Sequence, residues 1–274
     1  MRKNKSVLLS VPYIVWMVVF TLIPLGVVAY YALTDPETGA FTWSNILELG
    51  TYLPVFGQSI LYSLVSALIC LVLGYPVAYY IAHRGHVAQK LLYMLVMLPM
   101  CMSFLLRTLA WVGLLQDTGI INNLLEAIGL SRVKLIRTPA AVILGMVYNY
   151  LPYMILPLYS IIVKIDNRLI EAAEDLGCTP VQTFVKVVLP LSTPGIVSGI
   201  TMVFVPAVST FYISQKLGGA GTVLIGDIIE RMFKQGNNAN LGAALSLLLM
   251  ILVFVCTGIM NKLTGSDGED VVIV

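Results

Sequence analysis

Long runs of apolar residues recur along the chain, and they constrain its fold more than any other feature. Several runs reach about twenty residues without a charged side chain, which is the length that an α-helix needs to cross a bilayer. Only 11% of the 274 residues are charged, whereas soluble domains carry about 25%. The sequence therefore predicts an all-α membrane protein, with a single transmembrane domain over residues 1–274.

Six apolar segments are predicted to span the membrane. Their approximate limits are residues 7–31, 59–81, 91–115, 139–162, 194–213 and 241–260. The first segment follows a basic start, Arg2-Lys3-Asn4-Lys5, as a secretory signal does. It is too long for the apolar core of a signal and lacks a small-residue cleavage site, so we expect it to be retained as a span.

The positions of Lys and Arg predict the orientation of the spans, because basic loops favour the cytoplasmic side. Six spans place both termini on one side. With the termini inside, the cytoplasmic Lys and Arg residues are Arg2, Lys3, Lys5, Arg84, Lys90, Lys164, Arg168, Lys186 and Lys262, against Arg132, Lys134, Arg137, Lys216, Arg231 and Lys234 outside. The first loop, which has acidic residues and no basic ones, agrees. We therefore expect both termini to be cytoplasmic.

Charge and cysteine content exclude other classes of protein. The net charge of +2 gives no reason to expect a nucleic-acid partner. The cysteines lie far apart and show no metal-ligand spacing, so neither a disulfide framework nor a metal site is predicted: Cys70, Cys101, Cys178 and Cys256. His83 and His86 stand among basic residues without further ligands, which also speaks against a metal site.

One long polar segment, residues 164–190, interrupts the apolar pattern and still shows helical order; we call it the polar loop. Asn167 can cap a first helix, and Gly177 can end it in a left-handed conformation. Apolar residues of this helix fall on one face: Leu169, Ala172, Ala173 and Leu176. Thr179-Pro180-Val181-Gln182 is typical of the start of a second helix with a capping box, which Pro190 and Pro194 would end.

The predicted pair of capped helices lies at the cytoplasmic surface. One interpretation is a docking site for another protein, since small residues let a second surface approach closely. The alternative is an amphipathic connector that rests on lipid headgroups. The residue pattern alone does not decide between them.

The polar loop resembles the EAA loop of permease subunits from bacterial binding-protein-dependent ABC importers. The resemblance rests on Glu171-Ala172-Ala173, on Gly177 and on Leu189-Pro190 at the family spacing. Other segments resemble the B-type permease subunit of spermidine/putrescine importers: Leu73-Gly74-Tyr75-Pro76, the stretch 138–145, Leu156-Pro157-Leu158-Tyr159-Ser160 and Leu224-Ile225-Gly226. One departure is Gln215-Lys216, where that family leads us to expect an acidic residue.

The resemblance implies a type I ABC importer permease in a bacterial inner membrane. Its implied partners are a second, homologous permease subunit, a cytoplasmic ATPase pair that binds ATP and Mg, and an extracytoplasmic substrate-binding protein. The residues implied to couple the chain to the ATPase are Glu171, Ala172, Ala173, Asp175, Gly177, Leu189 and Pro190. The chain has no G-x-x-x-x-G-K-[ST] phosphate loop, so we expect it to be no enzyme and to hold no cofactor.

Polar and aromatic residues in and near the later spans are candidates for the substrate path. They are Arg107, Trp111, Asp117, Tyr148, Tyr153, Ser209, Tyr212 and Asp227. Aromatic faces attract ammonium groups, but packing and interfacial belts explain single aromatic residues equally simply. Arg107 could snorkel to the outer interface, or pair with Asp117 or Asp227 at an outer gate.

Two further features concern movement and docking. Prolines inside the spans, such as Pro152 and Pro206, suit helices that bend, although proline is also common in membrane helices generally. Thr222–Lys234 repeats apolar residues and is predicted to form a short extracytoplasmic helix, a candidate surface for the binding protein.

The favoured function is a pore-forming permease subunit that moves polyamines into the cell by alternating access. One alternative is a sibling permease for another small solute, such as an organic amine, a phosphonate or a metal chelate. The second is a membrane scaffold or receptor that only docks a cytoplasmic partner. A proton-coupled carrier is disfavoured because no predicted span contains a carboxylate.

Overall fold

The computed structural model describes residues 11–36, 38–234 and 238–263. The described residues contain five helices that are long and apolar enough to cross a membrane, or six when the bent pair Pro180–Leu191 and Thr193–Val208 counts as one span. Apart from one isolated bridge between Thr34 and Phe41, the regular structure in these residues is helical. The predicted all-α membrane fold is confirmed.

The chain divides into two compact units. The first comprises residues 1–54 and 228–252, and the second comprises residues 55–227 and 253–274. The first unit holds the long helix Val11–Ala32, which includes the π-helical turn η1 (Val18–Leu22) and α2 (Ile23–Ala32). Its other helices are α3 (Ser44–Glu48), the 3-10 turn η2 (Leu49–Tyr52) and most of α14 (Ile225–Lys234) and α15 (Ala239–Leu263). The basic start and the first residues of the predicted span 7–31 lie outside the described residues.

Within the first unit, two asparagines hold the end of α2 in place. The last carbonyl groups of a helix have no partner inside the helix and need another donor. Asn45 donates its side-chain amide to the carbonyl oxygens of Ala32 and Thr34, at 3.1 and 3.0 Å. Asn240, in the first turn of α15, donates to the Thr34 carbonyl oxygen at 2.6 Å. Ala32 also packs against Ala243 and Ala244, so α2 and α15 lie side by side.

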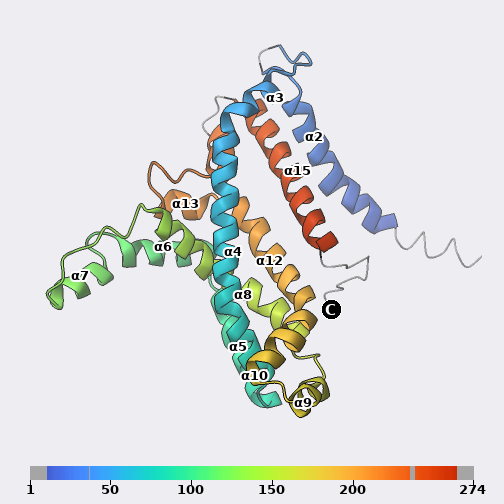
Figure 1. Ribbon diagram of the computed structural model, residues 1–274. Coiled ribbons are helices and arrows are strands. Elements are labelled where there is room, and N and C mark those ends of the chain that lie inside the picture. The colour runs from blue at the N-terminus through green and yellow to red at the C-terminus, as the bar shows by residue number, and fades with distance from the viewer. Residues whose placement is uncertain (1–10, 37, 235–237, 264–274) are drawn as a thin grey trace, which may run out of the picture. The chain divides into compact units, whose positions relative to one another are not determined.

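The second unit holds the rest of the helices. They are α4 (Leu53–Ala82), α5 (His86–Met97), the 3-10 turn η3 (Leu98–Cys101), α6 (Phe104–Leu115), α7 (Ile120–Ala127), α8 (Pro139–Ile162), α9 (Asn167–Asp175), α10 (Pro180–Thr183), the π-helical turn η4 (Phe184–Val188), α11 (Leu189–Leu191), α12 (Thr193–Val208) and α13 (Tyr212–Leu217). Their arrangement can be followed in Figure 1. Helix α4 begins six residues earlier than the predicted start at residue 59.

Helix α8 forms the core of the second unit, and glycines bring its neighbours close. Met146, Met154 and Leu158 of α8 are fully buried. A Cβ added to Gly199 of α12 would lie 2.6 Å from the Met154 sulfur, and one added to Gly74 of α4 would lie 3.2 Å from the Met154 Cγ. Such close contacts at small residues are the usual way that membrane helices pack.

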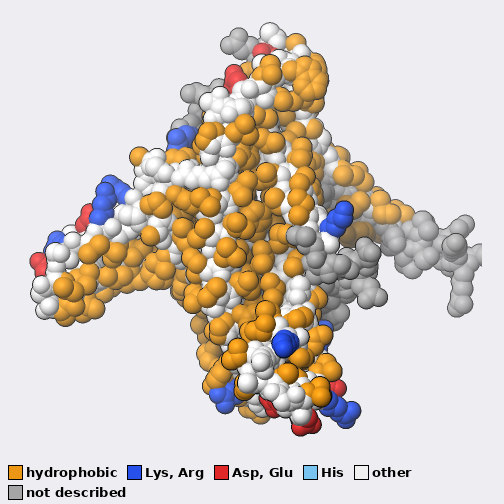
Figure 2. Space-filling view, viewed as in Figure 1, with side chains coloured by type: hydrophobic (Ala, Val, Ile, Leu, Met, Phe, Trp, Pro, Cys, Tyr) orange, Lys and Arg blue, Asp and Glu red, His pale blue; other side chains and the backbone are white. Residues whose placement is uncertain are grey.

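The remaining side of α4 carries exposed apolar residues, namely Leu61, Leu64, Leu68 and Val72. Figure 2 shows hydrophobic side chains over the flank of α4 and charged side chains around the polar loop. An apolar surface of this extent is unusual on a protein surrounded by water, and it suits contact with lipid.

Two predicted spans are broken rather than continuous. The span 91–115 divides into α5 and α6, because η3 with Pro99 and the extended residues Met102 and Ser103 lie between them. Proline removes a backbone donor and crowds the preceding turn, which favours such a break. The span 194–213 ends its first helix, α12, at Val208, and α13 begins at Tyr212.

Candidate functional site

The first helix of the polar loop, α9, is capped by Asp166 and not by the predicted Asn167. The Asp166 backbone is extended, and its carboxylate accepts a hydrogen bond from the Arg168 amide at 3.0 Å. Asn167 is the first helical residue. Asp and Asn both cap helices well, so residue type does not decide between them. The preceding turn, in which the Ile165 amide donates to the Ile162 carbonyl oxygen, ends one residue before Asp166 and leaves Asp166 in the capping position.

The end of α9 has the left-handed glycine that the sequence predicts. Gly177 has a φ of +83°. The Cys178 amide donates to the Ala173 carbonyl oxygen at 3.0 Å, and the Gly177 amide donates to that of Glu174 at 2.8 Å. These two bonds form a Schellman motif, which turns the chain sharply into the second helix.

The second helix of the polar loop begins with the predicted capping box. The Thr179 hydroxyl accepts from the Gln182 amide at 3.4 Å, and the Gln182 side chain accepts from the Thr179 amide at 2.9 Å. The helix then runs through η4 and α11, past Pro190, and meets α12 at an angle of 65°. The predicted end at Pro190 and Pro194 is therefore confirmed: the bend lies at Ser192, between these two prolines, where α11 ends and α12 begins.

The two alanines of the EAA-like segment differ in exposure. Ala173 is buried inside the polar loop, whereas Ala172 is exposed with its acidic neighbour Glu171. A shared role for both alanines in close approach is thus not possible in this conformation. The exposed apolar residues of the loop are Leu176, with 86% of its surface accessible, and Val181, with 71%. The loop therefore presents apolar side chains beside carboxylates at its surface.

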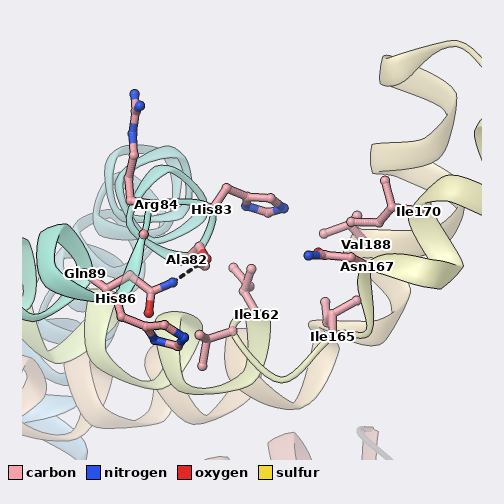
Figure 3. Close-up of a pocket in the computed structure, with 12 residues that line it drawn as sticks. Ala82, His83, Arg84, His86, Gln89, Ile162, Ile165, Asn167, Ile170 and Val188 are labelled. Atoms are coloured by element: carbon pink, nitrogen blue, oxygen red, sulfur yellow. Dashed lines mark hydrogen bonds between the residues drawn. The ribbon is translucent and has the colours of Figure 1, made fainter.

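A cavity of about 350 Å³ separates the polar loop from the turn between α4 and α5. His83, His86 and Asn167 are directed toward this cavity, while Arg84 points away from it (Figure 3). Gln89 closes one edge by donating to the Ala82 carbonyl oxygen at 2.9 Å. Within the described residues, no group of three His, Cys, Asp or Glu side chains could hold a metal ion.

A second candidate site lies where α12 ends and α13 begins; we call it the broken-helix site. It encloses a cavity of about 270 Å³ lined by Phe104, Leu105, Tyr150, Ser209, Thr210, Phe211 and Tyr212. Among the predicted path residues, Ser209 and Tyr212 line it directly. The sequence did not point to Tyr150 or Leu105, because neither stands in a distinctive local pattern.

Side chains satisfy the backbone groups that the broken helix frees. The Tyr150 hydroxyl donates to the Pro206 carbonyl oxygen at 3.2 Å. The Ser209 hydroxyl donates to the carbonyl oxygens of Val205 and Pro206, at 3.2 and 3.4 Å. Irregular backbone at membrane depth is tolerated only where such partners exist or a cavity is lined. The break is therefore a built feature of the second unit.

Arg107 is buried beside this site, and no carboxylate of the described residues forms an ion pair with it. Its side chain lies on the same face of α6 as Phe104, and only 7% of its surface is accessible. Its Nε and Nη1 atoms have no hydrogen-bond partner among the described residues, and the ion pairs found there join other residues. The predicted pairing with Asp117 or Asp227 is thus not formed in the described structure.

The two aspartates named as possible partners have different environments. Asp117 is exposed. Asp227 is buried and accepts hydrogen bonds from the Ser214 hydroxyl at 2.9 Å and the Leu224 amide at 2.8 Å, so it holds α13 against the start of α14. Gly226 permits this arrangement, because an added Cβ would lie 2.5 Å from the Thr210 carbonyl oxygen.

The other predicted aromatic residues mainly pack against each other. Trp111 and Tyr148 meet edge to face, with ring centroids 5.3 Å apart. Tyr153 lies 6.3 Å from the Tyr150 ring and remains partly exposed. The first contact joins α6 to α8, and the second lies within α8. Trp111, Tyr148 and Tyr153 are not among the residues that line the broken-helix site.

Residues 71–264 match the family described as "Binding-protein-dependent transport system inner membrane component". The chain belongs to this family. It is therefore a multi-pass inner-membrane permease component of a transport system, in agreement with its apolar helices. The match covers the polar loop and the broken-helix site together.

Relatives at the level of whole chains are also permeases. The chain is 37% identical over 247 residues to the spermidine/putrescine transport system permease protein PotB of Escherichia coli (strain K12), covering 87% of this chain and 90% of the relative. It is 38% identical over 253 residues to PotB of Haemophilus influenzae, covering 88% of each. The inner membrane ABC transporter permease protein YdcU of Escherichia coli is 29% identical, over 90% of this chain and 84% of the relative.

Solved structures with the same fold are ABC transporters. A chain of a bacterial transporter that imports the acidic polysaccharide alginate aligns with a TM-score of 0.81 at 19% identity, over 98% of this chain and 97% of that one. A chain of the MetNI methionine ABC transporter, in an inward-facing conformation, aligns with a TM-score of 0.61 at 20% identity, over 81% and 98%. These likenesses confirm the permease fold.

Proposed function

We propose that this permease is one of two pore-forming subunits of an ATP-driven importer that carries polyamines such as spermidine and putrescine. The observation that carries this proposal is the polar loop: a capped, surface-exposed helix pair set between apolar helices, in a chain of the permease family. The identity of 37% with a spermidine/putrescine permease over most of the chain supports the substrate.

In this proposal the polar loop receives a cytoplasmic ATPase, and both termini lie in the cytoplasm. Leu176 and Val181 supply exposed apolar contact, and Glu171 supplies a carboxylate for a basic groove. The rigid end of α9 at Gly177 keeps these residues in one arrangement. The ATPase pair supplies ATP and Mg, and a binding protein delivers substrate at the opposite face. This chain itself moves the substrate and catalyses no reaction.

The broken-helix site is the proposed substrate path. Its cavity is lined by aromatic rings and hydroxyl groups, and aromatic faces attract ammonium groups by about 0.5–2 kcal/mol. A buried guanidinium at Arg107 would repel a polyamine unless a carboxylate accompanied it. The second permease subunit is the proposed source of that carboxylate, because a buried charge without a partner costs several kcal/mol.

Arg107 also favours a second candidate function. A buried cation without a carboxylate, together with Gln215-Lys216 in place of an acidic residue, would suit a solute with an acidic group, such as a phosphonate. In that case the substrate itself would supply the negative charge next to Arg107. The permease would then serve a sibling importer with the same ATP-driven mechanism.

Uptake by the reconstituted complex distinguishes the two. The chain would be placed in proteoliposomes with the proposed second permease, ATPase and binding protein, with labelled spermidine or putrescine outside and ATP inside. We expect ATP-dependent uptake that unlabelled polyamine inhibits and a phosphonate does not. Uptake of a labelled phosphonate, with no uptake of either polyamine, would favour the second candidate.

A further inference from the structure

The second helix of the polar loop is joined to α4 by aromatic rings and one buried hydrogen bond. We propose that Phe184, Tyr75 and Ser192 are positioning residues for transport, which transmit movement of the polar loop to α4 and to the bend before α12. The proposal rests on the proposed function, since it takes the polar loop to be moved by an ATPase.

Phe184 provides the first contact. It begins the π-helical turn η4, and its ring meets two tyrosines of α4 edge to face. Its centroid lies 5.4 Å from that of Tyr75, at 86°, and 5.8 Å from that of Tyr79, at 84°. Tyr75 and Tyr79 stand one helical turn apart on the same face of α4. Edge-to-face pairs are directional, so Phe184 holds the polar loop in one register along α4.

The buried hydrogen bond lies at the bend. The Tyr75 and Ser192 hydroxyl oxygens are 2.7 Å apart, and Ser192 is fully buried. The Ser192 hydroxyl donates its own hydrogen to the Leu189 carbonyl oxygen at 2.9 Å. Tyr75 must therefore be the donor in the bond to Ser192. This bond ties α4 directly to the residue at which α11 and α12 meet at 65°.

We call the contacts among Phe184, Tyr75 and Ser192 the link. The local backbone on both sides of the link can change shape. A π-helical turn is rare and often marks a functional position in a helix, and η4 lies immediately before α11. On α4, Pro76 follows Tyr75 and removes one backbone hydrogen bond. These features place deformable backbone next to firm side-chain contacts, which is the arrangement that a transmitting link needs.

From Tyr75 the link reaches the helix that carries the broken-helix site. Gly74, next to Tyr75, packs directly on Met154 and Ile155 of α8. Tyr150 stands one turn earlier on α8 and donates to the Pro206 carbonyl oxygen. Displacement of the polar loop thus passes through Tyr75 and α8 to the broken-helix site by contacts that are all formed within the second unit.

Removal of single groups tests the link. Tyr75→Phe and Ser192→Ala each delete one hydroxyl of the buried bond, and Phe184→Leu removes the ring but keeps an apolar side chain. Ser63→Ala is the matched control. Ser63 is also fully buried, but among the described residues its hydroxyl bonds only to the Ser59 carbonyl oxygen of its own helix. Each variant is reconstituted with its partners, and assembled complex is quantified by size-exclusion chromatography.

The readout is the number of ATP molecules hydrolysed per polyamine imported, which a merely structural role would not change in assembled complex. We expect Tyr75→Phe and Ser192→Ala each to raise this ratio about fivefold, the effect of one net hydrogen bond on an equilibrium. The double variant should be no worse than either single variant. Phe184→Leu should raise the ratio as well, and Ser63→Ala should leave it unchanged.

Two results would overturn the link. One is an unchanged ratio in both hydroxyl variants, and the other is a double variant whose effect is the product of the two single effects. If Tyr75→Phe and Ser192→Ala prevented assembly, an unchanged ratio in Phe184→Leu would count against the link in the same way. Absence of ATP-dependent uptake in the wild-type complex would instead refute the proposed function, so the two failures are distinguishable.

Discussion

The polar loop and the broken-helix site differ in how far apart in the sequence their parts lie. The caps and turn of the polar loop involve residues within five positions of one another. The broken-helix site combines side chains from α6, α8 and the segment 209–212. The loop is thus a local structure that presents an exposed surface. The site depends on packing between distant helices and leaves the Nε and Nη1 atoms of Arg107 buried without a hydrogen-bond partner among the described residues.

The difference indicates a division of labour. The locally built caps and turn of the loop, from Asp166 to Gln182, keep their arrangement while the loop is moved, which suits docking. A site assembled from several helices changes when any of them shifts, which suits a gated path. If the division is right, substitutions in the polar loop should change coupling to the ATPase, and substitutions at the broken-helix site should change transport of the substrate. Substitutions that change both would contradict it.

The largest effect is expected at Arg107. Arg107→Gln would leave the proposed carboxylate of the second permease buried without its cation, which costs about 3–5 kcal/mol. We therefore expect polyamine uptake to fall strongly while the ATPase still binds. Arg132→Gln is the control, because Arg132 forms an exposed ion pair with Glu126 at 2.7 Å, and such pairs contribute about 0–1 kcal/mol. Normal uptake by Arg107→Gln at normal expression would exclude Arg107 from the mechanism.

Substitutions at Gly177 test the role of the polar loop, again against a control variant. A β-branched residue in the left-handed region is strained by roughly 1–2 kcal/mol, so Gly177→Val should uncouple ATP hydrolysis from uptake without preventing membrane insertion. Gly177→Asn should be milder, since asparagine adopts this conformation more readily. Gly113→Ala, at a helical glycine with open space around it, should behave as wild type. Equal uptake in all three variants would show that the turn is not needed for coupling.

Tyr150→Phe should have a smaller effect that is confined to the broken-helix site. The hydrogen bond to the Pro206 carbonyl oxygen is lost, which costs about 1 kcal/mol, but Ser209 still donates to the same oxygen. We expect a modest change in the polyamine concentration for half-maximal uptake and no change in ATPase binding. A loss of ATPase binding would show that the two regions are not separable.

The smallest effects concern the start of α9. Asp166→Ala should expose the first amides of the helix to faster hydrogen exchange, because a lost cap costs about 0.5–2 kcal/mol. Asn167→Ala should leave their exchange nearly unchanged, since Asn167 does not cap in this structure. Hydrogen exchange at residues 168–170 measures both variants. Faster exchange in Asn167→Ala than in Asp166→Ala would instead identify Asn167 as the cap.

These residues also show what the sequence could predict. The glycine end of α9, the capping box at Thr179 and the apolar helices were predictable, because their determinants lie within a few residues or repeat with the helix period. The identity of the α9 cap was missed by one position, since two neighbouring residues cap equally well. The break between α12 and α13 and the burial of Ala173 depend on packing that local pattern does not encode, whereas Pro99 is a local signal for the break between α5 and α6.

The contacts missed from sequence are long-range ones. Tyr75 and Ser192 are 117 positions apart, and Tyr150 and Pro206 are 56 apart. No periodicity or motif indicates that such residues will meet, because their approach follows from how α4, α8 and α12 pack. The pairing of Arg107 with Asp117 or Asp227 was predicted wrongly for the same reason. The sequence does not show that Asp117 is exposed or that Asp227 bonds to Ser214 and Leu224.

Cross-linking from the exposed tip of the polar loop tests most directly whether the loop couples this permease to an ATPase. Leu176→Cys would be made in a chain whose accessible cysteines, Cys101, Cys178 and Cys256, are replaced by serine, and the reconstituted complex would be treated with a short reagent that joins a thiol to an amine. Leu61→Cys, on the exposed apolar face of α4, is the control. We predict cross-links from position 176 to the ATPase and loss of ATP-driven uptake once they form. Normal uptake with position 176 cross-linked only to lipid or to nothing would contradict the role of the polar loop.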